Sequence, residues 1–367
     1  MKKAVLVLFV MIFLSSLSFS VSAQENESLS LDTYLDKVYE TIPEEVEELL
    51  PKDKISDTVS PTGMISVIEA ILNQELKNTV YFLATLLITV FLVILTHTTT
   101  ESFSIPIPFA GSVSQLALLT FLMTHVFEAA RSVLLYCQKT EGFLGSVNAV
   151  LSSLLFLGGN AKASVGISGG MAAIALLLEK GIYHVLMPTV SLSLIGTVGL
   201  TVLGDGLSSV GKVARNLFQW LIGIVSFFTV LIMTSQSILS ASEDSLSAKT
   251  IRFAISSSIP IVGGAVGDSL STLSSSIDVI RKTVGTLGVL GILILMLYPL
   301  VSLFAMKLSV YLCEEVSLLF SVSSVSILLG EIRKLLNMLI AVSVIVLLLS
   351  IFALSLYMLI PIAIGGV

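Results

Sequence analysis

Long apolar runs recur through the chain after residue 78, and short polar turns separate them. The longest runs reach the length that a helix needs to cross a bilayer, about 20 residues, and they lack the alternation of barrel strands. Hydrophobic residues make up 55% of the 367 residues, charged residues 12%, and the mean hydropathy of +1.01 lies outside the range of soluble domains. The sequence therefore predicts an all-α, polytopic helical membrane protein with about seven to nine membrane helices.

The first 78 residues differ from the rest of the chain. Residues 1–23 begin with Lys2 and Lys3, continue with an apolar core and end in small residues at Ala23, which is the pattern of a cleaved signal peptide. An uncleaved first membrane span is the alternative, although the apolar core is short for a span. Residues 24–78 hold 13 acidic and 4 basic side chains and carry helical periodicity. We expect this acidic leader to be a short helical region outside the cytoplasm.

Residues 79–248 form the first group of predicted membrane helices. The loop that contains Lys212 and Arg215 is predicted to lie in the cytoplasm, because basic residues favour the cytoplasmic side of a membrane. The expected apolar segments are 79–96, 109–136, 142–157, 165–178, 181–203 and 218–239.

Residues 283–367 form the second group, with expected helices at 284–306, 308–329 and 335–360. Glu314 and Glu315 lie inside one of these apolar runs, where placing a carboxylate in the membrane is unfavourable in free energy. These intramembrane charges should face a partner, a cavity or an interface. Two roles fit Glu314 and Glu315: each forms a structural ion pair, or each takes part in the protein's function.

Two short motifs of the first group of helices recur in similar form in the second group, and we call each such pair an echo. The sequence MPTVSL at 187–192 resembles YPLVSL at 298–303, and SSVGKVARNLF at 208–218 resembles SILLGEIRKLL at 326–336. The two echoes differ in offset, so duplication with an insertion is one explanation and coincidence is the other. Internal repeats are common in transporters, where the site lies at the interface of the repeats.

A polar stretch at 249–282, rich in Ser and Gly, separates the two groups. Its proline and glycines disfavour a continuous helix, so we expect a helix, a break and a second helix. At membrane depth a broken backbone is tolerated only where protein buries it or a wet cavity solvates it, which predicts a pore or a subunit interface. A hairpin lying in the headgroup region is the alternative. The candidate pore or interface residues are Arg252, Pro260, Gly263, Gly264, Gly267 and Asp268.

Two motifs in this stretch, RFAI at 252–255 and PIVGGAVGD at 260–268, resemble the signature of the stage III sporulation protein AE family. The resemblance extends over nearly the whole chain. It implies a subunit of the channel or secretion-like complex that the mother cell of an endospore-forming bacterium places in the outer forespore membrane, with the N-terminus extracytoplasmic. It also implies that this complex supports late forespore gene expression.

The resemblance further implies protein partners. The other stage III sporulation proteins AA to AH would share the complex, the ATPase AA would supply its energy, and the forespore-made stage II sporulation protein Q would face it. Self-association and contact with membrane lipid also fit a polytopic protein. The sequence has no basic stripe with interleaved aromatic residues, so no nucleic-acid partner is expected.

Motifs of catalysis are absent from the sequence. It has no P-loop, GxSxG or HExxH motif, and its three histidines are scattered. Cys137 and Cys313 are isolated, so neither a disulfide nor a metal site is expected. We therefore expect no enzyme activity and no cofactor. The alternative to a complex subunit is a self-sufficient secondary transporter for a small solute or ion, with Asp268 or the carboxylates Glu314 and Glu315 coupling the ion.

Overall fold

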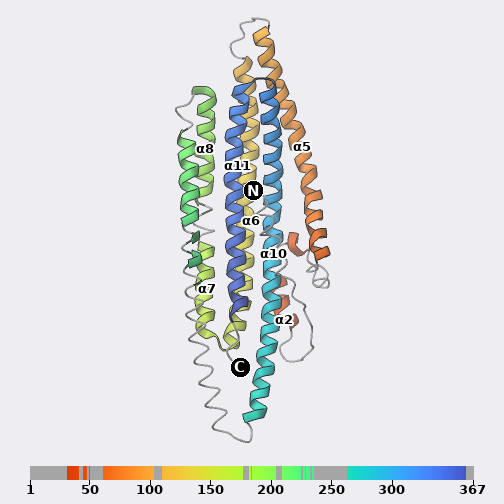
Figure 1. The fold of residues 1–367 in the computed structure, drawn as a ribbon, viewed down its shortest axis with the longest axis vertical. Helices are drawn as coiled ribbons and strands as arrows, with labels where there is room; N and C mark the ends of the chain where they lie inside the picture. The colour runs from red at the N-terminus through yellow and green to blue at the C-terminus, as the bar shows by residue number, and fades with distance from the viewer. Residues whose placement is uncertain are drawn as a thin grey trace.

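The chain folds into an elongated bundle of helices that run along one long axis (Figure 1). The computed structural model describes residues 31–40, 44–47, 49, 61–102, 110–176, 182, 184–203, 209–224, 226–227, 229–231, 234 and 263–360. All regular structure in these ranges is helical, which confirms the predicted all-α class. Five helices in the described ranges are long and apolar enough to cross a membrane.

Two short helices precede the bundle, and the others are much longer. The helices are α2 (Leu31–Tyr39), α3 (Glu44–Glu47), α5 (Pro61–Ser102), α6 (Ala110–Leu157), α7 (Ala161–Leu176), α8 (His184–Leu203), α10 (Gly263–Leu319) and α11 (Ser323–Leu359). A further helical segment, Ser209–Leu231, follows α8.

Two helices continue through positions where the sequence predicted ends. α6 is one helix of 48 residues, although its apolar runs stop near Tyr136 and resume at Gly142. α10 is one helix of 57 residues that includes Lys307, where a boundary between two helices was expected. The physical reason is that lysine, glutamate and glutamine interrupt an apolar run but are good helix formers. The chain instead turns after α10, where Ser321 has a φ of 59°.

The pair of helices α10 and α11 forms the centre of the bundle. A β-carbon built on Gly288 would lie 2.9 Å from Leu354, and one on Gly285 would lie 2.7 Å from Met358, so the two helices are antiparallel and in close contact. This register sets residues 283–306 of α10 beside residues 335–359 of α11. We call these charge-free stretches the slab. They rise about 36 Å, enough to cross the hydrocarbon core of a bilayer, about 30 Å thick.

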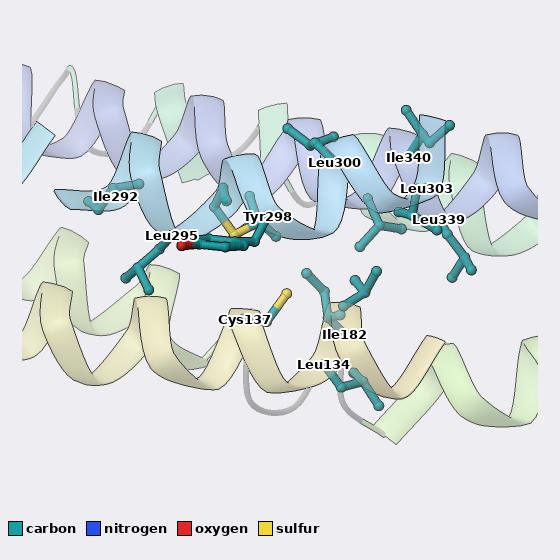
Figure 2. Close-up of a cluster of buried hydrophobic side chains, with 14 of the residues drawn as sticks. Leu134, Cys137, Ile182, Ile292, Leu295, Tyr298, Leu300, Leu303, Leu339 and Ile340 are labelled. Atoms are coloured by element: carbon teal, nitrogen blue, oxygen red, sulfur yellow. The ribbon is translucent and has the colours of Figure 1, made fainter. Parts of the chain in front are cut away.

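α6 packs on the slab with its buried face. The Tyr136 and Tyr298 rings stack with centroids 5.9 Å apart, and Gly291 leaves space for the ring of Phe143. Figure 2 shows Tyr298 of α10 and Cys137 of α6 in the space between the two helices. These contacts run in order along both helices, so α6 lies beside the slab through most of its depth.

A second apolar level lies beyond the slab, around the turn between α10 and α11. Here the Phe91 ring of α5 meets the Phe320 ring with centroids 5.8 Å apart, and Gln115 of α6 donates a hydrogen bond to Ser324 of α11 at 2.8 Å. We call this part of the bundle the tip. Its large apolar side chains include Leu95 and Leu319, which are 58% and 82% exposed.

Candidate functional site

The segments that echo in the sequence lie in two helix pairs with related geometry. The first helix pair is α8 with Ser209–Leu231, and the second is α10 with α11. α8 and α10 each contain an internal proline, Pro188 and Pro299. A glycine near the start of each second helix lets the first helix approach. A β-carbon on Gly211 would lie 3.1 Å from the Ser193 backbone, and one on Gly330 would lie 3.2 Å from a carboxylate oxygen of α10.

A buried ion pair joins the two helix pairs. Arg215 of the first pair places its guanidinium Nη2 2.7 Å from Oε2 of Glu331 in the second pair. Their side chains are only 6% and 7% exposed. The other carboxylate oxygen of Glu331 accepts a hydrogen bond from Lys334 Nζ at 2.7 Å. Both oxygens of Glu331 are therefore used, as a buried carboxylate requires.

A second ion pair closes the turn between α10 and α11. Glu314 Oε2 lies 2.9 Å from Arg333 Nε, and Arg333 also stacks over the Tyr311 ring, 5.6 Å from its centroid. Gly330 provides the space for this carboxylate. Together, Arg215, Glu314, Glu331, Arg333 and Lys334 make a charged layer between the slab and the tip.

The adjacent carboxylates predicted as intramembrane charges have different environments. Glu314 is half-buried and forms an ion pair with Arg333. A structural ion pair was one of the two roles that the sequence allowed for this carboxylate. Glu315 is one residue further around the helix and exposed, with no ion pair among the described residues. Glu315 is therefore an exposed carboxylate beside this layer that has no ion-pair partner among the described residues.

The candidate pore residues that the structure describes lie far from this layer. Arg252 and Pro260 are outside the described residues. Gly263, Gly264, Gly267 and Asp268 lie in the first turns of α10, whose helix begins at Gly263. Asp268 and Glu314 belong to the same helix and are about 70 Å apart at 1.5 Å per residue. The described members of the two groups thus lie toward opposite ends of α10.

A second polar cluster lies toward the Asp268 end. Tyr357 of α11 shares its hydroxyl with Ser152 of α6 at 2.7 Å and donates a hydrogen bond to Asn148. Arg281 of α10 is buried, pairs with Asp278 and donates to the carbonyl of Ile360. The slab therefore has polar side chains at each of its two ends.

Comparison with known proteins decides the family. A family model described as stage III sporulation protein AE matches residues 44–361. The chain belongs to the stage III sporulation protein AE family. No curated protein and no solved structure matches the chain. The matched residues include both helix pairs and the whole charged layer.

The sequence prediction missed the central ion pair of this AE protein. It placed Arg215 in a cytoplasmic loop, whereas Arg215 lies within the helical segment Ser209–Leu231 and is 5% exposed. The repeated motif was the signal that could have pointed to this pair. Arg215 lies in its copy at 208–218 and Glu331 in its copy at 326–336. In the described part of the chain no group of three or more His, Cys, Asp or Glu side chains gathers as for a metal ion.

Proposed function

We propose that this AE protein is a membrane subunit of the channel or secretion-like complex between the mother cell and the forespore. The complex is needed for endospore formation and for late forespore gene expression. The protein would lie in the outer forespore membrane with its N-terminus extracytoplasmic. Its partners would be the other stage III sporulation proteins AA to AH and stage II sporulation protein Q. Family membership supports the role in sporulation.

The observation that carries the complex role is the length of the helices. α6 has 48 residues and α10 has 57, so they extend about 72 Å and about 86 Å. The hydrocarbon core needs only about 30 Å of helix. A large share of the bundle therefore extends past any single bilayer, where it offers surface to other proteins.

The charged layer supports a role in assembly. Glu331 and Glu314 have their carboxylates held by arginines of the same chain. A carboxylate that couples an ion must exchange its counterion during transport, whereas one that fixes two helices keeps it. The contacts of Glu331 favour the second use.

A conditional deletion in an endospore-forming host tests this proposal. Cells that lack the protein should fail in late forespore gene expression, and the wild-type chain should restore it. The protein should also co-purify with other stage III sporulation proteins from sporulating cells. Normal spore yield without the protein, or a purified protein that has no such partners, would contradict the role.

A secondary transporter is the second candidate function, and one observation favours it. The two helix pairs echo each other in sequence and meet at a buried ion pair, and repeat-built transporters place their binding site at such an interface between repeats. Reconstitution of the purified chain alone in liposomes separates the two functions. Uptake of a small solute or ion by these liposomes, with no other subunit present, would favour the transporter.

A further inference from the structure

The outward face of α6 has an unusual composition for a helix beside a membrane slab. Its exposed positions repeat every three or four residues along one stripe. Only one of the central positions is a large apolar residue, and the others are charged, polar or small. The central stripe consists of Thr120, Thr124, Glu128, Arg131, Leu135, Gln138, Gly142, Gly145, Ala149 and Ser153.

The depth of this stripe follows from the opposite face of α6. Thr140 donates a hydrogen bond to Met296 at 3.4 Å, and Phe143 packs at Gly291, so both contacts lie within the slab. Gln138 is therefore near the middle of the slab. At a similar depth α11 exposes Leu348, which is 50% accessible and suited to lipid. A primary amide exposed to hydrocarbon would lack hydrogen-bond partners, which is strongly unfavourable in that medium.

Glu128 and Arg131 lie on the same stripe, at the end of the slab near the charged layer. Both are exposed, and among the described residues neither makes an ion pair. Residues three apart on a helix are close enough to pair, but these two do not form an ion pair in the structure. The stripe thus presents one acid and one base, about one helical turn apart, that are both available to a partner.

We propose that this stripe of α6 binds the same stripe of a second copy of the chain. Two copies inserted in the same orientation hold each residue at the same depth. In a two-fold pair, Glu128 of one copy then lies about 4.5 Å in depth from Arg131 of the other. The two-fold axis repeats this contact, so the interface has two equivalent ion pairs and no unmatched charge.

The lower stripe allows the helices to come close. Gly142 and Gly145 have no atom within 4 Å of the position of a β-carbon, so the space outside them is open in the single chain. Small residues let two helix backbones approach within a membrane, and polar side chains such as Gln138 form hydrogen bonds across that contact. The charges select the partner, and the small residues permit the approach.

Oxidative cross-linking in membranes tests the proposal. Cys137 and Cys313, which are buried, are first replaced by alanine, and a single cysteine is introduced as Gln138→Cys. The control is Leu348→Cys, which is exposed at a similar depth on α11. We expect severalfold more cross-linked dimer from Gln138→Cys, in cells that express no other sporulation protein. Equal yields from the two positions would overturn the proposal.

Charge exchange provides the matched second test. Glu128→Arg and Arg131→Glu should each reduce the cross-linked fraction at Gln138→Cys, and the two changes together should restore it. Gly142→Leu should also reduce it while the monomer stays folded, because that position is open in the single chain.

Two other occupants of the stripe would give different results. Cross-links that appear only with other sporulation proteins present would mean a different partner. Labelling of Gln138→Cys by a water-soluble thiol reagent without cross-links would mean a water-filled conduit. Either outcome would overturn the proposal of a second copy.

Discussion

Replacing Glu331 by glutamine removes the counter-charge of a buried guanidinium and keeps the volume of the side chain. Arg215 is then left 94% buried beside a neutral amide, since its side chain is 6% exposed. Breaking a buried ion pair on one side costs about 3–5 kcal/mol. The amide oxygen of Glu331→Gln still accepts one hydrogen bond, so we expect a loss of about 3 kcal/mol in the free energy of unfolding.

Glu314→Gln is the matched control, because it makes the same chemical change at another carboxylate of the charged layer. Its partner Arg333 has a side chain that is 36% exposed, so water solvates the guanidinium when the charge of Glu314 is lost. The expected loss is about 1 kcal/mol or less. The double change Arg215→Met with Glu331→Met should recover most of the stability, since well-packed apolar residues replace a buried pair at little cost.

The assay is unfolding of the purified protein by a denaturing detergent in mixed micelles. The chain has one tryptophan, Trp220, which lies in the same helical segment as Arg215 and is 65% exposed, so its fluorescence follows unfolding of that segment. If Glu331→Gln costs no more than Glu314→Gln, the ion pair does not hold the helix pairs together, and the reasoning from burial is wrong.

Four further predictions follow from other parts of the chain. Gly291→Leu should lower stability by about 1–3 kcal/mol in the same unfolding assay, because its β-carbon would lie 2.6 Å from the buried Phe143 ring. Tyr357→Phe should cost about 1–2 kcal/mol there through its lost hydrogen bonds. N-terminal sequencing of the membrane-bound protein should show cleavage after Ala23. Asp268→Asn, at normal protein level, should reduce spore yield if the carboxylate is used, and a wild-type yield would remove it from the candidate site.

The fold class could be predicted from the sequence because it depends on composition and apolar run length alone. The ends of the helices could not be predicted in this way, because the end of an apolar run is not the end of a helix. α6 shows this at Lys139 and Glu141, which lie within the helix and not in a turn. α10 shows it again at Lys307. The sequence marks which residues suit lipid, whereas backbone propensity decides where the helix continues.

The central ion pair could not be predicted in the same way, because its partners are 116 residues apart. Nothing local to Arg215 indicates burial, and basic residues near a membrane segment usually mark its cytoplasmic end. The echo between motifs contained both Arg215 and Glu331 but did not align them with each other, and it did not indicate that the two helix pairs touch. Contact between them is a property of the packed bundle.

The slab and the tip together place a limit on how the protein sits in a membrane. Residues 283–319 of α10 pass through both apolar levels and rise about 56 Å as helix, which is nearly twice the hydrocarbon thickness of one bilayer. The charged layer between the two levels favours water or headgroups on at least one side of it. One bilayer therefore covers either the slab or the tip. Leu319 at the tip and Leu348 on the slab are both exposed in the single chain, so the level outside lipid presents an apolar surface of the kind that binds protein.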